Sequence, residues 1–322
     1  MYSVNQLYAR ALLQYAADAQ LSIPASLQQA VEKSSRLPLE LLDQLWDACC
    51  ETSADPLAGL RIGLNLQPGH LDSAGLLLMT CATIGEALEQ LVEVAPIVGG
   101  GGEFILSGEG SQASIGYQPN LATRQAERVE AVLAGTLSLA RWASGGSFMP
   151  SELRLMHKPL SARADYSALL DVNVCFQATE NALVFPQEQL ALPLMQANPT
   201  LCDYLHALTE RTLAELGCQS LSAKTQTMIQ HYPRWGRDRI AAEMGLSGRH
   251  LNRKLASEGC SFKTLRDSTL HQLALTRLQS NDKLDDIADG LGFSDHSAFS
   301  KAFKRWAGVT PSQVRKITLE GD

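Results

Sequence analysis

Hydrophobic and polar residues alternate at helical spacing through the N-terminal part of the chain. Apolar residues return every three or four positions, as in a helix with one buried face. The helices predicted there are Asn5–Ala19, Leu39–Cys50, Leu57–Leu64 and one that begins after Thr83 and ends at Pro96. Thr83 and Glu86 have the spacing of a capping box, in which each side chain satisfies a free backbone amide.

The period changes in the middle of the chain, where short stretches alternate apolar and polar positions as strands do. The strands predicted are Glu103–Leu106, Ala113–Tyr117, Glu152–His157, Val174–Phe176 and Leu183–Phe185. The Gly- and Ser-rich segment Ser107–Gln112 predicts a hairpin between the first two. Helices are expected over Leu121–Ala143 and Thr200–Leu216. Together these elements predict an α+β domain with a small, mostly antiparallel sheet packed by helices.

From Ser222 onward the pattern is helical with short breaks, and one motif occurs twice at an offset of 47 residues. In each copy an alanine precedes a glycine by four positions: Ala241 and Gly245, then Ala288 and Gly292. A helix-turn-helix needs a small residue where its helices cross and a turn residue that tolerates positive φ. We therefore predict an all-α domain with two such motifs, and Ser247 and Ser294 as N-caps of their second helices.

The outer faces of these second helices are polar and basic. The first presents Arg249, His250, Asn252, Arg253 and Lys254, and the second presents His296, Ser297, Ser300, Lys301, Lys304 and Arg305. Arg and Lys can donate to guanine, Asn pairs with adenine, and further cations suit phosphates. The alternative is a pair of ordinary helical hairpins with solvated faces, and two copies in register favour DNA binding.

The formal net charge of −7 hides a difference between two parts of the chain. Residues 1–218 carry 11 basic and 23 acidic residues, a charge of −12, whereas residues 219–322 carry 16 and 11, a charge of +5. A basic part suits a polyanion such as double-stranded promoter DNA. A length of 322 residues also fits two domains. We expect one domain over residues 1–217 and another over 222–318.

The sequence shows no familiar motif for catalysis, metal binding or nucleotide binding. The seven cysteines form no Cys-x-x-Cys pair, and the glycine run 99–102 lacks the spacing of a phosphate-binding loop. We therefore expect no catalytic residue, no metal and no cofactor. No apolar run approaches the ~18 residues of a membrane span, and no export signal precedes the first helix. A cytoplasmic protein without a membrane partner is expected.

A small-molecule pocket in the first domain is conceivable, although no pattern names its ligand. Arg61, His70 and His157 are candidate pocket residues, and each is better explained as a surface group or a satisfied buried group.

The second motif and the residues after it closely resemble the C-terminal signature of AraC/XylS-type transcription regulators. The matching positions are Gly292, Phe293, Ser294, Phe299, Lys301, Phe303, Lys304, Trp306, Gly308, Thr310, Pro311, Ser312 and Arg315. The N-terminal part more loosely resembles the arabinose-binding-like sensing domain of the subgroup that includes ornithine-utilisation regulators, in the segments 55–63 and 83–88. Leu270 and Val314 depart from the pattern, where the family commonly has an arginine and an aromatic residue.

The resemblance implies a bacterial transcription regulator with two recognition helices, at about 248–256 and 295–306, in successive major-groove segments. It places base reading on Arg249, Asn252 and Arg253 in the first helix, and on His296, Ser297, Ser300 and Lys301 in the second. The expected partners are promoter DNA, a small-molecule effector of unknown identity, a second copy in a homodimer, and RNA polymerase. The alternatives are a ligand-independent regulator, controlled by its abundance or a protein partner, and an enzyme fused to a DNA-binding module.

Overall fold

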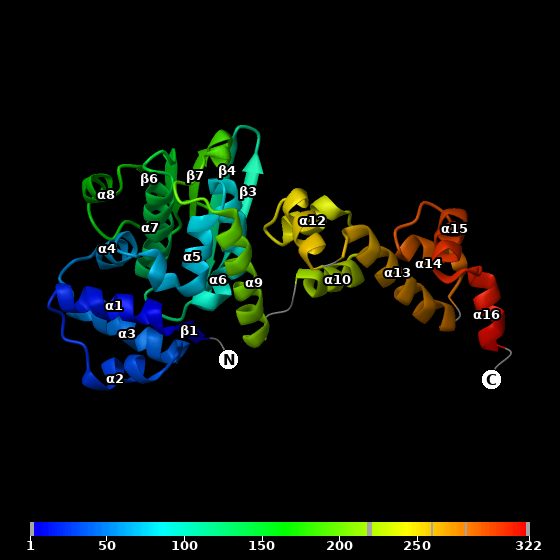
Figure 1. Cartoon of the computed structure of the whole chain (residues 1–322), viewed down its shortest axis with the longest axis horizontal. Helices are drawn as coiled ribbons and strands as arrows, with labels where there is room; N and C mark the ends of the chain where they lie inside the picture. Colours follow the sequence, from blue (N-terminus) through cyan, green and yellow to red (C-terminus); the bar gives the residue numbers. More distant parts are fainter. Residues whose placement is uncertain (1–2, 218–220, 259, 281, 320–322) are drawn as a thin grey trace. The chain divides into compact units, whose positions relative to one another are not determined.

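The computed structural model describes residues 3–217, 221–258, 260–280 and 282–319 (Figure 1). The chain divides into two compact units, Met1–Cys218 and Gln219–Asp322. The first combines helices with two small sheets, and the second is helical, so the α+β and all-α classes predicted from the pattern are confirmed. No helix among the described residues is both long and apolar enough to cross a bilayer.

The first unit begins with a helical layer around its own apolar core. Its elements are β1 (Ser3–Asn5), α1 (Gln6–Asp18), α2 (Ala25–Lys33), β2 (Arg36–Pro38) and α3 (Leu39–Thr52). The Asn5 side chain caps α1 by accepting from the Tyr8 amide at 2.8 Å. Trp46 and Leu45 of α3 are fully buried in this core. Helices α1 and α3 confirm the sequence prediction, whereas α2 and the β1–β2 pair were not predicted.

A five-stranded sheet forms the second layer, in the order β3-β4-β7-β5-β6. Its strands are β3 (Gly102–Glu109), β4 (Gln112–Pro119), β5 (Glu152–Leu155), β6 (Asn173–Phe176) and β7 (Ala182–Pro186). All neighbours are antiparallel except β5 and β6. The predicted hairpin is present but tighter than expected, because Glu109 already pairs with Gln112.

Helices pack around the sheet and share its core. They are α4 (Ala58–Leu64), the 3-10 helix η1 (Pro68–Leu71), α5 (Asp72–Thr80), α6 (Ile84–Val98), α7 (Gln125–Ala143), α8 (Arg163–Leu170), the 3-10 helix η2 (Gln187–Ala191) and α9 (Pro199–Glu215). Apolar residues of α5, α6 and α7 form one cluster with those of β4, β5 and β7.

The prediction that Pro96 ends α6 is wrong, because the helix continues to Val98. Proline removes one backbone donor, and in the last turn that loss affects a single hydrogen bond. The Arg36 guanidinium then serves the helix end, since its Nη1 donates to the Ile97 carbonyl at 2.7 Å and its Nη2 to the Pro96 carbonyl at 3.3 Å. At the other end Thr83 Oγ1 accepts from the Glu86 amide as expected, while Glu86 accepts from Ala82 rather than Thr83.

Helices α4 and α7 cross at glycine contacts. A Cβ added to Gly59 would lie 2.0 Å from the Glu127 carbonyl oxygen, and one added to Gly63 would lie 2.2 Å from that of Ala131. Two turns of backbone on α4 therefore touch the backbone of α7 directly. This contact fixes α7, the helix that joins the two apolar clusters of the unit.

The second unit consists of seven described helices. They are α10 (Leu221–His231), α11 (Arg237–Glu243), α12 (Gly248–Ser257), α13 (Phe262–Gln279), α14 (Leu284–Gly290), α15 (His296–Ala307) and α16 (Pro311–Leu319). Helix α13 contacts α10 and α12 on one side of the unit, and α14, α15 and α16 on the other. It is therefore the common support of both motifs. Leu270, where the family often has arginine, is buried on this helix.

The glycine contact of α4 provides a test of this packing. Gly59→Ala would force two backbones apart, and overpacking of this kind destabilises a protein by about 1–3 kcal/mol. We expect chemical denaturation of the full chain to show that loss of unfolding free energy. Gly69→Ala is the control, because its Cβ would meet nothing within 4 Å; equal stability of the two variants would contradict the crossing.

Candidate nucleic-acid interface

Both predicted turns adopt the same backbone geometry. Gly245 has a φ of 68° and Gly292 a φ of 83°, the left-handed region that glycine enters without steric cost. In each motif the residue after the glycine donates to the carbonyl of the alanine: Leu246 to Ala241 at 2.8 Å, and Phe293 to Ala288 at 2.9 Å. Both alanines are buried. The turns of the two helix-turn-helix motifs thus share one backbone geometry.

The caps of the second helices differ from each other. Ser247 caps α12 as predicted, accepting from the His250 amide at 3.2 Å. The prediction of Ser294 as the cap of α15 is wrong, because Asp295 Oδ1 accepts from the Ala298 amide at 2.7 Å. A carboxylate is the stronger acceptor for amides at a helix N-terminus, and α15 starts one residue later than the repeat implies. The Ala298 amide, with help from the Ser294 hydroxyl, lowers the pKa of Asp295.

Fewer residues are exposed on the outer face of α12 than the sequence analysis expected. Arg249, Asn252 and Arg253 are exposed. His250 and Lys254, expected on the same face, retain only 1% and 6% of their exposure. They directly precede Leu251 and Leu255, the two leucines that α12 buries completely.

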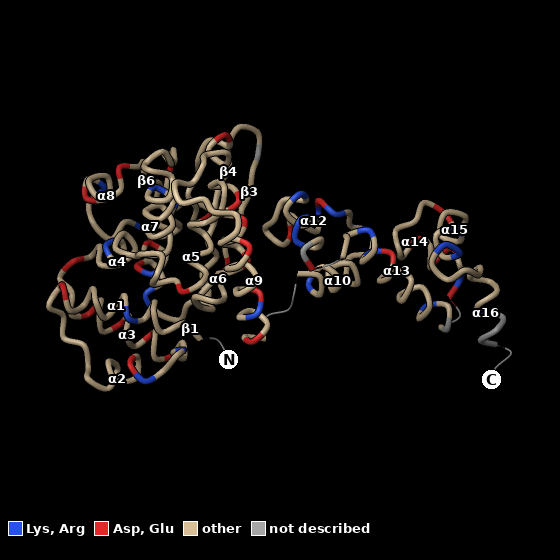
Figure 2. Tube along the Cα trace, viewed as in Figure 1, with Lys and Arg blue, Asp and Glu red and all other residues tan. Residues whose placement is uncertain are grey.

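The outer face of α15 is open along its length. His296, Ser297, Lys301, Lys304 and Arg305 are exposed, and Ser300 is half-buried. Figure 2 shows Lys and Arg along both α12 and α15. Arg305 Nη2 lies 3.2 Å from Asp267 Oδ1 on α13, and its guanidinium lies over the Trp306 ring. The inner face buries Phe299 and Phe303.

Helix α13 is tied to the polypeptide before the first motif. Arg266 donates through Nη2 to the Pro233 carbonyl at 2.6 Å and through Nη1 to the Trp235 carbonyl. Trp235 in turn stacks on Tyr232, with ring centroids 3.9 Å apart. Burial lowers the pKa of Arg266, which still lies far above neutral pH for any arginine. These bonds hold the segment between α10 and α11 against α13.

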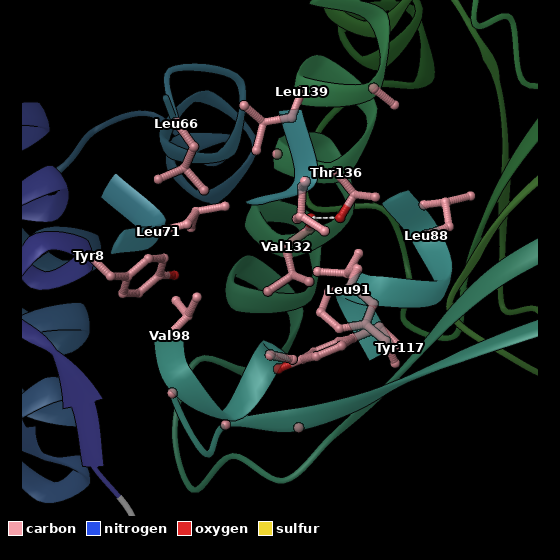
Figure 3. Close-up of a pocket in the computed structure, with 18 of the residues that line it drawn as sticks. Tyr8, Leu66, Leu71, Leu88, Leu91, Val98, Tyr117, Val132, Thr136 and Leu139 are labelled. Carbon is pink, nitrogen blue, oxygen red and sulfur yellow. Dashed lines mark hydrogen bonds between the residues drawn. The ribbon is translucent and has the colours of Figure 1, made fainter. Parts of the chain in front are cut away.

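The first unit contains a partly open cavity of about 160 Å³ among α6, α7 and the start of β3 (Figure 3). Its walls are mostly aliphatic. Four of its residues carry side-chain polar groups: Tyr8, Tyr117, Arg128 and Thr136. Thr136 donates to the Val132 carbonyl at 2.8 Å within its own helix. Arg128 donates through Nη1 to Asp43 Oδ1 and is almost fully buried.

None of the three candidate pocket residues lines this cavity. Arg61 forms an ion pair with Asp55 at 2.5 Å, and His70 Nδ1 accepts from the Gln67 amide at 3.1 Å. His157 lines a separate, more polar hollow together with Met156 and Asn181. The sequence analysis missed the residues that line the cavity. The charge of Arg128, beside the inward residue Val129 of α7, is a signal that could have indicated one of them.

A buried carboxyl group lies beside His157. Glu130 on α7 is fully buried and accepts from the Tyr166 hydroxyl at 2.5 Å. His157 Nε2 lies 3.6 Å from the same carboxyl oxygen. Burial raises the pKa of Glu130 to about 7; the Tyr166 hydrogen bond opposes this shift and the charge of Glu127 adds to it. Among the described residues no group of His, Cys, Asp or Glu is placed to hold a metal ion.

Comparison with known proteins gives matches in both units. A family model described as the arabinose-binding domain of AraC transcription regulator, N-term, matches residues 16–194, and a helix-turn-helix domain model matches residues 240–317. The chain is 26% identical to the ornithine utilization regulator of Pseudomonas aeruginosa, over 96% of this chain and 95% of that one. It is also 26% identical to the HTH-type transcriptional regulator VqsM of the same species, over 63% and 64% of the two chains.

One solved structure has the same fold throughout. The transcriptional regulator CdpR from Pseudomonas aeruginosa aligns with a TM-score of 0.53 and 21% identity, covering 95% of this chain and 97% of its own.

The raised pKa of Glu130 predicts a pH-dependent stability. A carboxyl whose pKa rises from 4.5 to about 7 on folding stabilises the folded state while protonated, and this contribution is lost as the pH rises through 7. We expect the unfolding free energy to fall between pH 5 and pH 8, by at most roughly 3 kcal/mol from this group. In Glu130→Gln the fall should be smaller.

Chemical denaturation of the full chain at the two pH values measures the effect, with exposed Glu188→Gln as the control. The same pH dependence in Glu130→Gln and in the unsubstituted chain would contradict a buried, protonated Glu130.

Proposed function

The chain belongs to the AraC family of transcription regulators, and on this premise we propose that its two helix-turn-helix motifs read adjacent major-groove segments of one promoter site. It is a DNA-binding regulator of that family with an arabinose-binding-like N-terminal domain. The observation that carries the proposal is the repeated turn geometry of Gly245 and Gly292, which leaves one helix of each motif with an open basic face.

The proposed base-reading residues are the exposed polar groups of these faces. On α12 they are Arg249, Asn252 and Arg253, and on α15 they are His296, Ser297, Ser300 and Lys301. Lys304 and Arg305, nearer the C-terminal end of α15, are assigned to phosphates. His250 and Lys254, which the sequence placed on the DNA-facing side of α12, are left out of the proposed contacts because they are buried.

Helix α13 supports the proposal because both motifs pack on it. Two recognition helices that share a support keep a constant spacing. Major-groove segments on one face of B-DNA also repeat at a constant spacing, of about 34 Å. Binding of one motif then places the other beside its own segment without a further search.

We assign sensing of a small molecule, dimerisation, or both to the first domain. Its apolar cavity supports the sensing role. A ligand that binds one arrangement of two subunits better than another would shift the population on paired half-sites. The protein would act on promoter DNA in the bacterial cytoplasm as a homodimer, with RNA polymerase as a further contact. Its relatives are transcription regulators, which favours this role over that of an enzyme.

Removing the Arg253 side chain tests base reading. A bidentate contact to a base contributes about 1–3 kcal/mol to discrimination, so Arg253→Ala should lose that much at a cognate site and relax its sequence preference. The cognate fragment is taken from genome-wide mapping of bound sites, and affinity is measured on it and on a random duplex. Arg10→Ala, an exposed arginine of α1, is the control. Equal losses on both duplexes would show that Arg253 contacts only phosphate.

The variant Lys304→Ala tests a phosphate contact, as Arg253→Ala tests a base contact. A phosphate contact is blind to sequence, so affinity should fall alike on cognate and random DNA, and the slope of log affinity against log salt should shrink by about 1. Exposed Lys33→Ala is the control. Binding that is unchanged in affinity and salt slope would remove Lys304 from the interface.

A further inference from the structure

We propose that the cavity of the first unit binds a largely apolar small molecule whose single polar head is an uncharged hydrogen-bond acceptor, such as a ketone carbonyl. This inference rests on the sensing role proposed above and names the chemical class of the effector.

The walls of the cavity favour a hydrocarbon body. Leu88 and Leu91 face it from α6, and Val132 and Leu139 from α7 (Figure 3). Moving a charged group from water into such surroundings without a partner costs several kcal/mol, whereas burying hydrocarbon is favourable. The body of a ligand that fits is therefore apolar.

One end of the cavity carries hydrogen-bond donors. Tyr8 reaches it from α1 and Tyr117 from β4 (Figure 3), and both line it together with Arg128. Tyr117 as a residue is 6% exposed, and its side chain is one of the few polar ones in the cavity wall. A ligand acceptor placed there would receive a hydrogen bond inside apolar surroundings, where a hydrogen bond is stronger than in water.

Both phenols remain donors at neutral pH. Burial raises the pKa of Tyr8 to about 12 and raises the pKa of Tyr117 as well, while the Arg128 charge opposes both shifts. An acceptor on the ligand therefore meets hydroxyl groups rather than phenolate oxygens.

The charge at this end is already balanced. The guanidinium of Arg128 is paired with Asp43, which does not line the cavity. A carboxylate head would add a second negative charge beside a guanidinium that Asp43 already balances. An ammonium head would lie beside a guanidinium, and no Asp or Glu is among the described lining residues. The cavity is thus unsuited to a zwitterionic amino acid such as ornithine, despite the similarity to an ornithine utilization regulator.

The test compares three probes on the full chain by isothermal titration. Decan-2-one has the apolar body and a neutral acceptor, decanoate has a body of similar length with a charged head, and L-ornithine has charged heads only. We expect decan-2-one to bind at least ten times more tightly than decanoate, and L-ornithine to show no binding. No binding of decan-2-one at its solubility limit, or tighter binding of either charged probe, would overturn the proposal.

The variant Tyr117→Phe tests whether the Tyr117 hydroxyl binds the polar head of the ligand. Loss of one donor should weaken decan-2-one about tenfold. The thermal midpoint without ligand should change little, because Tyr117→Phe keeps the ring that packs in the cavity wall. Tyr232→Phe, an exposed tyrosine of the second unit, is the control. Unchanged affinity in Tyr117→Phe would overturn the assignment of this hydroxyl to the ligand head.

Promoter affinity with and without decan-2-one separates this inference from the sensing role. If the ketone binds but promoter affinity and transcription do not change, the ligand class stands and the sensing role fails. If the chain binds promoter DNA but not the ketone, DNA recognition stands and the proposed ligand class fails.

Discussion

Each helix-turn-helix motif depends on one residue whose backbone adopts the left-handed conformation with positive φ. Gly245 and Gly292 hold positive φ, and the amide that follows each of them closes onto a buried alanine, Ala241 or Ala288. A side chain at the glycine would be strained in this conformation, and a larger residue than alanine would separate the helices. The direction of α12 and of α15 follows from this turn. The basic outer faces are exposed because Leu251, Leu255, Phe299 and Phe303 are directed inward by the same geometry.

The first domain buries charged and polar side chains within an apolar interior. Arg128 is balanced by Asp43, and Glu130 is held by Tyr166 with His157 nearby. Arg128 and Glu130 both lie on α7, whose position is fixed by the glycine contacts of α4. The tight crossing therefore also positions the donor end of the cavity. Arg128 and Glu130 are bonded to protein groups, whereas the Tyr117 side chain lines the cavity where the proposed ligand head would bind.

Sequence patterns were sufficient where one residue type is physically required. Turn glycines, crossing alanines and apolar stripes predicted both motifs and most helices and strands. Patterns failed where the outcome depends on distant groups: Pro96 is tolerated because Arg36 reaches the end of α6. They also failed where two adjacent acceptors compete, since Asp295 rather than Ser294 caps α15. The burial of His250 and Lys254 and the cavity beside Tyr117 depend on packing between segments far apart in the sequence, which no local pattern records.

The central claim is that the two motifs contact one promoter site together, as two recognition helices on a shared support. Hydroxyl-radical footprinting of the full chain on a fragment recovered by genome-wide mapping tests it most directly. The account predicts, for each bound subunit, two protected segments on one face of the DNA, about one helical turn or 10 base pairs apart. A single protected segment per subunit, or two segments on opposite faces, would contradict it.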